Sequence, residues 1–346
     1  MVAITSCLAW VKRSWCYLLI CFLAAVLLTG YRVEMLNNYL GYEYYIDFSI
    51  PKPFVFRLLI PWLAKVIHLS IPLSLPTIFL AVELLGLFLQ LLLFYYYVRL
   101  FIQQDVLAKI LSFSIVFVYP FELILPRINP LWLPYDVWAG VFITAGLILL
   151  YRRQLGWLYP LFILATLNRE TSIFLVVILV ITYWKSAPRA SVISHALALA
   201  GIWLLIKIGL EMLFAQHAGA TFQHQYLQNL YFFSQEQDRA QLLYKVAYII
   251  GNFGFLWMPV VRYYTQIDND FLRRSLLMFI PFYLAMLYVA NIFEYRIFGE
   301  MIPVLLAPAL YILVRQIQRH RDLLMTEWTV PRAQPAAPAA RAAPPR

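Results

Sequence analysis

Residues 155–184 read LGWLYPLFILATLNRETSIFLVVILVITYW, two apolar runs joined by the polar residues 168–171. Arg152 and Arg153 precede this stretch, and Lys185 follows it. Each apolar run has about 13 residues, whereas a helix that crosses a membrane needs about 20. We therefore expect a hairpin of two short helices, with a polar tip that is buried in protein or lines a wet cavity. The alternative is one long tilted helix with a snorkelling Arg169, which would place Lys185 on the opposite side of the membrane.

The composition indicates that this hairpin belongs to a membrane protein. Of the 346 residues, 63% are hydrophobic and 13% are charged, whereas a soluble domain has about 45–50% apolar and about 25% charged residues. Soluble enzymes, nucleic-acid-binding proteins, disulfide scaffolds and disordered chains are excluded together. The sequence predicts an all-α fold, a polytopic membrane helix bundle of about 8–10 membrane segments that include the short-helix hairpin.

The remaining spans and loops follow from hydropathy. The transmembrane helical domain covers residues 1–329 and has an outer loop at 31–72, which contains an interfacial helix within Phe54 to Leu69, and a second outer loop at 215–240. The tail 330–346 contains little but Pro, Ala and Arg and is expected to be disordered and cytoplasmic. The predicted spans are 15–30, 73–98, 110–125, 134–151, 190–214, 241–261, 275–293 and 301–318.

The positive charges fix the expected orientation. Cytoplasmic loops of membrane proteins retain Lys and Arg. With the N-terminus inside, the inner segments hold 17 of the 27 Lys and Arg residues but only 5 of the 17 Asp and Glu residues. The net charge of +10 is therefore a sign of topology and not of nucleic-acid binding. Both termini are expected in the cytoplasm, and the single-helix alternative for 155–184 would spoil this distribution.

Most of the acidic residues fall on the predicted outer side, and several have an arginine close by. Charges at a membrane boundary are costly unless they are paired or hydrated, so this concentration indicates a shared polar cavity. Ordinary loop charges that face water are the alternative. The combinations are Glu43 and Asp47 before Arg57, Arg127 before Asp136, Asn168 and Arg169 beside Glu170, and Arg296 between Glu294 and Glu300.

These residue types have distinct chemical uses. A carboxylate in the first outer loop can serve as general base for an acceptor hydroxyl, and the candidates are Glu34, Glu43 and Asp47. The planar guanidinium of arginine binds phosphate in a bidentate manner, and the candidates are Arg57, Arg169 and Arg296. A purely structural pair between Arg169 and Glu170 is the alternative at the hairpin tip.

Other catalytic templates are absent from the sequence. It contains no HExxH, GxSxG, P-loop or GxGxxG motif. Its five histidines show no spacing typical of a zinc site. No metal ligands are therefore assigned.

Three short elements resemble the GT-C superfamily of integral membrane glycosyltransferases, in particular uncharacterised bacterial members. The stretch Pro53-Phe54-Val55-Phe56-Arg57-Leu58-Leu59-Ile60-Pro61-Trp62-Leu63 is similar to a "PF-x-x-R-x-L-x-P-x-L" element of such members. Leu167-Asn168-Arg169-Glu170-Thr171 and Glu294-Tyr295-Arg296 are similar to their later elements. The resemblance implies a GT-C-like bundle in a bacterial cytoplasmic (inner) membrane with a catalytic acid in the first outer loop. Many members have paired acids early in that loop and a larger soluble domain, and this chain shows neither clearly.

The predicted function follows from this resemblance. It implies transfer of a sugar from a polyprenyl-phosphate-linked donor to a glycan, lipid or protein acceptor on the non-cytoplasmic face. The phosphate leaving group needs little acid help, so no cofactor is required and a divalent cation is optional. Membrane lipid is an expected partner and nucleic acid is not. The alternatives are a transporter or flippase that uses Glu83, Lys207 and Glu211, where Lys207 and Glu211 also have the spacing of a structural pair, and a non-catalytic subunit of a polysaccharide assembly.

Overall fold

The fold is described from a computed structural model, which covers residues 2–36, 38, 41–124, 131–222, 224–234 and 239–329. Every regular element in these ranges is a helix. Six segments are long and apolar enough to cross a membrane: 14–35, 75–99, 105–124, 189–213, 270–289 and 299–321. The predicted all-α polytopic bundle is therefore confirmed as a class, with six segments of spanning length in the described ranges where about 8–10 membrane segments were predicted. Arg127 and the tail 330–346 lie outside the described residues.

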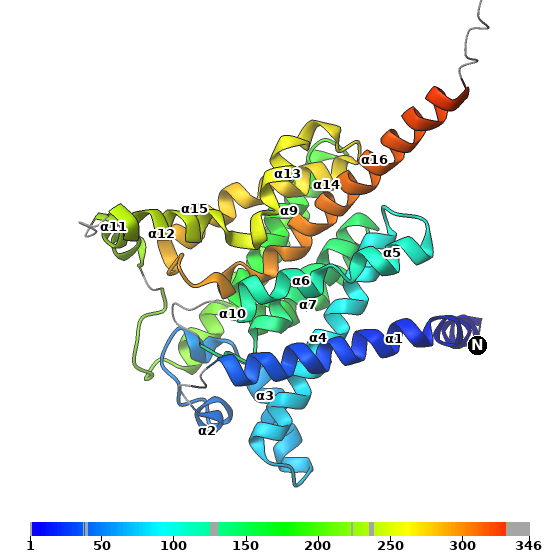
Figure 1. The fold of residues 1–346 in the computed structure, drawn as a ribbon. Coiled ribbons are helices and arrows are strands. Elements are labelled where there is room, and N and C mark those ends of the chain that lie inside the picture. The colour runs from blue at the N-terminus through cyan, green and yellow to red at the C-terminus, as the bar shows by residue number, and fades with distance from the viewer. Residues whose placement is uncertain are drawn as a thin grey trace, which may run out of the picture.

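The long helices form the frame of the bundle. Helix α4 (Leu75–Arg99) packs against α1 (Val2–Met35) and α7 (Asp136–Tyr151), and the last long helix is α16 (Ile302–Thr329). The beginning of α1 and the end of α16 lie toward the same side of the bundle (Figure 1).

Helices α8 (Leu155–Asn168) and α9 (Ile173–Tyr183) form the predicted hairpin. Both ends of the hairpin meet the end of α7, where Tyr183 Oη donates to Leu150 O at 2.5 Å and Arg153 Nη2 donates to Ser186 O at 3.3 Å. The tip lies at the beginning of α7, since Asn168 Nδ2 donates to Tyr135 O at 3.1 Å. The chain therefore runs along α7 in α8, reverses at residues 168–171 and runs back in α9 to the end from which it started. The alternative of one long tilted helix is wrong.

The hairpin helices are short because the chain breaks at its polar tip. A helix of 14 residues such as α8 spans about 21 Å, less than the ~30 Å of a bilayer core. Arg169 is extended (φ −160°, ψ 140°) and a short 3-10 helix η3 (Glu170–Ser172) follows it. The break lies buried among α7, α8 and α9, as irregular backbone at membrane depth requires.

The predicted span 241–261 is not one continuous helix. It consists of α12 (Arg239–Ile250), the 3-10 helix η4 (Asn252–Phe255) and α13 (Trp257–Arg262). Phe253, Gly254 and Phe255 have positive φ values of 57°, 58° and 64°, which end a right-handed helix. The freed N–H of Phe253 donates to the carboxylate of Glu122 at 2.5 Å, so a buried acid from another segment compensates the break.

A buried charge pair fastens α1 to the bundle. Arg32 Nε donates to Glu83 Oε1 at 2.6 Å, and Arg32 Nη1 donates to Leu123 O at 2.9 Å. Leu123 belongs to the π-helical turn η2 (Pro120–Ile124), which leaves carbonyl groups free of the regular α-helical pattern. Trp132 Nε1 donates to the other oxygen of Glu83. Glu83, which stands alone among apolar residues in the sequence, is thus fully engaged in the fold.

The first loop folds onto α4 and ends in a short helix. Tyr42 and Tyr45 pack around Phe79 and Trp132, with ring centroids 5.3–6.3 Å apart. Helix α3 (Leu59–Ser70) follows, and its Trp62, Val66 and Leu69 are exposed on one face. The predicted interfacial helix therefore begins at Leu59, and Arg57 precedes it.

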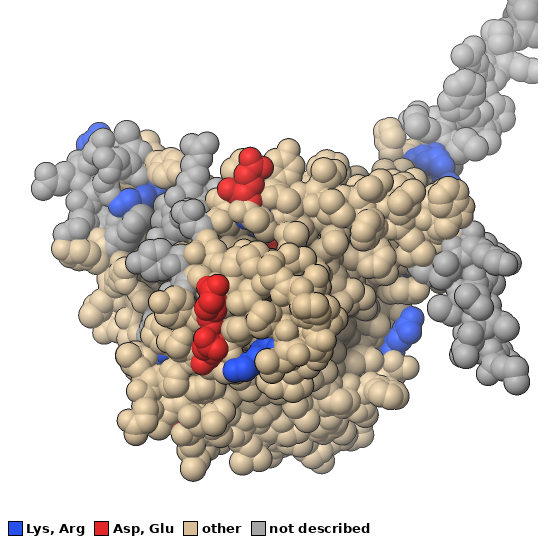
Figure 2. Space-filling view, turned by 90° about the horizontal axis from the view of Figure 1, so that it is seen from below, with Lys and Arg blue, Asp and Glu red and all other residues tan. Residues whose placement is uncertain are grey.

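Helix α10 (Arg189–Leu213) is a further long helix. The remaining elements are shorter: α2 (Tyr42–Ile46), η1 (Phe54–Phe56), α5 (Asp105–Ser112), α6 (Ile115–Tyr119), α11 (Tyr226–Ser234), η5 (Tyr264–Gln266), α14 (Asp270–Ser275), η6 (Leu276–Met278), α15 (Phe279–Val289), η7 (Tyr295–Ile297) and η8 (Gly299–Met301). On the face seen in Figure 2, a few charged side chains lie within an otherwise uncharged surface.

Candidate functional site

A cavity of about 250 Å³ lies where the hairpin tip meets the first loop, α10, α15 and the turn after α15. It lies at the end of the bundle opposite the turn that joins α7 to α8, because the hairpin tip and the start of α7 are at this end. The charged residues that line it are Arg57, Arg169, Glu170, Lys207, Glu294 and Arg296. We call it the arginine cavity. The structure thus brings together five residues named as site candidates from the sequence, and adds Lys207 to them.

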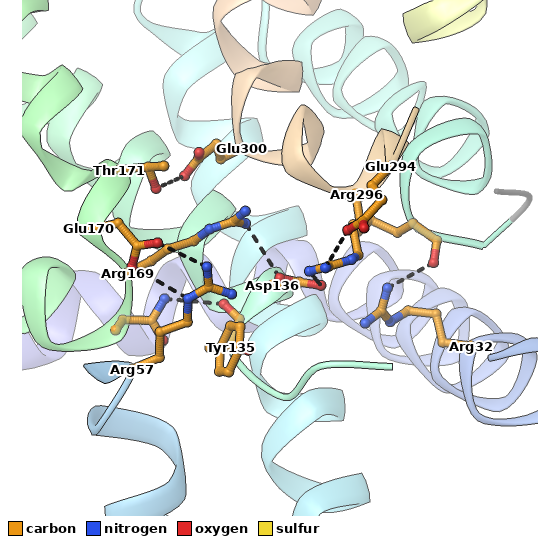
Figure 3. Close-up of polar contacts among 12 residues, drawn as sticks. Arg32, Arg57, Tyr135, Asp136, Arg169, Glu170, Thr171, Glu294, Arg296 and Glu300 are labelled. Carbon is orange, nitrogen blue, oxygen red and sulfur yellow. Dashed lines mark hydrogen bonds and ion pairs between the residues drawn. The ribbon is translucent and has the colours of Figure 1, made fainter. Parts of the chain in front are cut away.

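Asp136, a sixth candidate, lies directly beside this cavity. It begins α7 and is 3% exposed. Arg169 Nη1 lies 3.4 Å from one of its carboxylate oxygens, and Arg296 Nη1 lies 3.6 Å from the other (Figure 3). One carboxylate therefore orients two arginines that come from segments far apart in the sequence.

Arg57 and Glu170 form a second ion pair across the cavity. Arg57 Nη2 lies 2.9 Å and Nε 3.4 Å from the two oxygens of Glu170, and the guanidinium stacks 4.6 Å above the ring centre of Tyr135. Burial would lower the pKa of Arg57, but the neighbouring Glu170 carboxylate outweighs it and raises that pKa above its ordinary value. The arginine therefore stays charged. The proposed structural pair of Arg169 with Glu170 is not formed, since Glu170 pairs with Arg57 and Arg169 with Asp136.

Arg296 has a carboxylate partner of its own. Its Nη2 lies 2.5 Å from Glu294 Oε2. Burial would lower the pKa of Arg296, but Asp136 and Glu294 raise it above the ordinary value. Arg57, Arg169 and Arg296 are each 4–7% exposed, so three permanent charges are held within one small volume.

Several N–H groups of these arginines have no hydrogen-bond partner. They are Nη1 of Arg57, Nε of Arg169 and Nε of Arg296, all buried. Nη1 of Arg296 also forms no hydrogen bond and has only the ion-pair contact of 3.6 Å with Asp136. Buried donors in proteins are nearly always satisfied, and leaving one unsatisfied costs about 1–3 kcal/mol. Lys207 adds a further cation: it is 8% exposed, lies 4.4 Å from the ring centre of Phe56 and forms no ion pair with any described residue. The cavity is therefore rich in unused donors for an anion.

Asn168, Thr171 and Glu300 shape the hairpin tip, and of these three Thr171 lines the arginine cavity. The carbonyl contact of Asn168 holds the tip against α7. Thr171 Oγ1 donates to Glu300 Oε2 at 2.6 Å, and Glu300, 1% exposed, does not line the cavity. These contacts fix the backbone that presents Arg169.

The acids proposed as general base lie elsewhere. Glu34 is exposed in the last turn of α1, Glu43 is exposed on α2, and Asp47 is exposed just after α2. None of them lines the arginine cavity, where the carboxylates are Glu170 and Glu294. The three arginine candidates and the three carboxylate candidates therefore do not share one site in this structure.

Two loops at the mouth of the cavity are joined by contacts that the sequence did not predict. Lys52 Nζ lies 2.7 Å from Glu211 Oε1, and Thr221 Oγ1 donates to the other oxygen of Glu211 at 2.5 Å. Lys52 N also donates to Ala218 O at 2.8 Å. The interpretation of Lys207 and Glu211 as a structural pair is therefore wrong, because Glu211 pairs with Lys52. No signal in the sequence links Lys52 to a residue so far along the chain.

A signal for the Arg32–Glu83 pair does exist in the sequence. Arg32 closes the first span and Glu83 lies near the start of the next, so two opposite charges lie at the same end of adjacent helices. Pairing isolated charges by their depth would have found this contact.

In the described part of the chain, no group of three or more His, Cys, Asp and Glu side chains is placed to hold a metal ion. The carboxylates at the cavity are instead occupied by arginines. No residue is therefore assigned to a divalent cation.

No protein-family model, no curated protein and no solved structure matches this chain.

Proposed function

We propose that this protein is an integral membrane glycosyltransferase that takes a sugar from a polyprenyl-phosphate donor, and that the arginine cavity binds the donor. The observation that supports this most is the set of unpartnered N–H groups on three buried arginines around one cavity. Phosphate oxygens accept hydrogen bonds from guanidinium groups in a bidentate manner and carry the compensating charge.

The balance of charges favours a ligand with a small negative charge. Asp136, Glu170 and Glu294 each neutralise one of the three arginines, and Lys207 has no carboxylate partner among the described residues. A phosphodiester that links a lipid to a sugar carries one negative charge and matches this surplus.

The walls of the cavity suit the other two parts of such a donor. Trp203 of α10 and Ala285, Met286 and Val289 of α15 line it, and both helices lie in candidate membrane spans. A hydrocarbon chain that enters between these helices would stay among apolar side chains. The rings of Phe54, Trp203 and Phe222 also line the cavity and offer flat apolar faces to a sugar ring. Trp203 is held in place by its donation to Glu170 O at 2.9 Å.

The reaction needs a group that accepts a proton. The acceptor oxygen forms a bond to the anomeric carbon of the sugar, the bond from that carbon to phosphate oxygen breaks, and the phosphate leaves with the electron pair. Of the two carboxylates that line the cavity, Glu170 is bound by two nitrogens of Arg57, whereas Glu294 is paired with a single nitrogen of Arg296, Nη2. We therefore assign the acceptor's proton to Glu294, and stabilisation of the departing phosphate to the arginines.

The orientation follows from the charges at the other end of the bundle. Arg152, Arg153, Lys185 and Arg189 lie at the turns that face away from the arginine cavity. Cytoplasmic loops are the ones that retain such charges, so the arginine cavity is assigned to the non-cytoplasmic side of a bacterial cytoplasmic membrane. The transporter alternative relied on Glu83, Lys207 and Glu211. Glu83 and Glu211 pair with Arg32 and Lys52, and Lys207 lines the arginine cavity, so no specific observation favours this alternative.

Transfer by the purified protein in lipid nanodiscs tests this proposal. With a radiolabelled polyprenyl-phosphate sugar and a mixture of envelope acceptors, the wild type is expected to transfer the label, and Glu294→Gln is expected to bind donor without transferring it. Asp47→Asn should transfer normally. Transfer by Glu294→Gln at the wild-type rate would overturn the base assignment, and transfer by an Arg169→Gln/Arg296→Gln variant would overturn the site.

A further inference from the structure

A second hollow lies on the opposite face of α15. A groove of about 590 Å³ is walled by α12, α13, α15 and α16, and it adjoins a compartment of about 160 Å³ with which it shares Ile249 and Tyr283. The residues of α15 that line these hollows are Phe279, Ile280, Tyr283, Leu284 and Leu287, whereas Ala285, Met286 and Val289 face the arginine cavity. The groove and its compartment therefore share no lining residue with the arginine cavity.

The groove itself is apolar and lies at membrane depth. Its walls include Phe253, Trp257, Val260, Ile280 and Leu305. The segments 270–289 and 299–321, which supply part of this wall, are candidate membrane spans. A hydrocarbon chain is the occupant that such a wall accepts without any loss of hydrogen bonds.

The adjoining compartment contains a polar pair with one unused acceptor. Asn252 Nδ2 donates to Tyr283 Oη at 3.3 Å. Asn252 is 2% exposed and its Oδ1 has no hydrogen-bond partner. The helix break at 251–256 places this side chain in the wall of the compartment. A buried carbonyl oxygen of this kind calls for a donor from a bound molecule.

The head group of that molecule is small and uncharged. No Lys, Arg, Asp or Glu side chain lines the groove or the compartment among the described residues, and an isolated charge in such surroundings is very costly. A hydroxyl group supplies the one donor that Asn252 Oδ1 lacks. We propose that this groove binds a single-chain lipid alcohol, whose hydrocarbon chain lies in the groove and whose hydroxyl donates to Asn252 Oδ1.

This site stands apart from the proposed transferase activity, because none of its residues belongs to the arginine cavity. Photocrosslinking in phosphatidylcholine nanodiscs tests it. The probes are a diazirine-bearing farnesol and its methyl ether, which has the same chain but no O–H donor. Labelled peptides are mapped by mass spectrometry. We expect the alcohol to label residues 249–264 and 276–287 about fivefold more than the ether does, as one added hydrogen bond would give.

Two variants and one control separate the polar site from the apolar groove. Asn252→Leu removes the acceptor and should bring the alcohol and the ether to equal labelling. Tyr283→Phe keeps the ring, removes the partner that orients Asn252, and should reduce the preference even where Asn252→Leu fails to fold. Tyr288→Phe is the control, because Tyr288 is exposed on the same helix and lines neither hollow. Equal labelling by both probes in the wild type, or an unchanged preference in both variants, would overturn the proposal.

Discussion

The guanidinium of Arg169 lies 3.4 Å from a carboxylate oxygen of Asp136, and both side chains are almost completely buried. Arg169 is at the tip of the hairpin and Asp136 begins α7, so the pair ties the irregular tip to a regular helix. Arg296 approaches the second oxygen of the same carboxylate at 3.6 Å. Asp136 is therefore the residue that keeps two of the three cavity arginines in place.

Replacing Asp136 by Asn should destabilise the protein strongly. The change leaves two buried arginines without their shared counter-charge, and removal of one partner of a buried ion pair typically costs about 3–5 kcal/mol. Thermal unfolding in detergent measures the effect. Asp270→Asn is the matched control, since Asp270 is exposed beside Arg273 and Arg274 and surface pairs contribute about 0–1 kcal/mol. Equal losses for the two variants would contradict the role given to Asp136.

Glycine is required at position 219, where the loop of residues 214–222 contacts the loop of residues 48–57 at the mouth of the arginine cavity. Gly219 has a φ of +100°, and a Cβ there would lie 2.5 Å from Lys52 O. Gly219→Ala should therefore loosen the loops, which hydrogen–deuterium exchange of residues 48–57 and 214–222 would detect as faster exchange. Gly209→Ala serves as control because nothing lies within 4 Å of its Cβ position within α10. In that helix, Gly209→Ala should leave the stability of the protein unchanged or raise it by up to about 1 kcal/mol. Slower exchange of the two loops in Gly219→Ala would contradict the close contact between Gly219 and Lys52.

The pairing of Glu211 can be measured by double-mutant cycles. Lys52→Met combined with Glu211→Gln should show a coupling of about 0.5–1 kcal/mol in unfolding free energy, since one partner is buried and the other is partly exposed. Lys207→Met combined with Glu211→Gln should show a smaller coupling. A larger coupling for the second cycle would restore the pairing expected from the sequence.

Orientation in the membrane is testable by cysteine labelling. In a background in which Cys7, Cys16 and Cys21 are replaced, Ser49→Cys should react in intact cells with a maleimide that does not cross membranes. Ser186→Cys should react only after the membrane is opened. Both positions are exposed and lie at opposite ends of the bundle. The reverse pattern of labelling would invert the proposed orientation.

The sequence predicted the frame of the fold well, because hydropathy and charge act locally. The two short runs around residues 168–171 were enough to predict the hairpin, since neither run can cross a bilayer alone. The same reasoning named Arg57, Arg169 and Arg296, because polar side chains at the membrane boundary gather where they can be paired. The structure places these three arginines around one cavity.

The partners within the cluster could not be predicted. Which carboxylate faces which arginine depends on how α7, the hairpin and the turn after α15 pack, and hydropathy carries no information about that. Arg169 thus pairs with Asp136 and not with its neighbour Glu170. The break at Phe253 was missed for a related reason, because its compensating acid, Glu122, comes from a distant segment.

The exposed positions of Glu34, Glu43 and Asp47 show what resemblance alone leaves open. The first loop of this chain packs its aromatic residues onto α4, and this packing leaves those acids on the outer surface. An acid of the right type in the right loop therefore does not imply a position at the cavity.

Equilibrium binding of a polyprenyl-phosphate sugar to the purified protein in nanodiscs tests the central claim most directly. Each guanidinium contact to phosphate typically contributes about 1.5–3 kcal/mol, so Arg57→Gln, Arg169→Gln and Arg296→Gln should each weaken binding about 10- to 100-fold. Arg262→Gln, an exposed arginine that lines no part of the cavity, should bind like the wild type. Unchanged affinity in all three cavity variants, with wild-type thermal stability, would contradict the claim that the arginine cavity is the donor site.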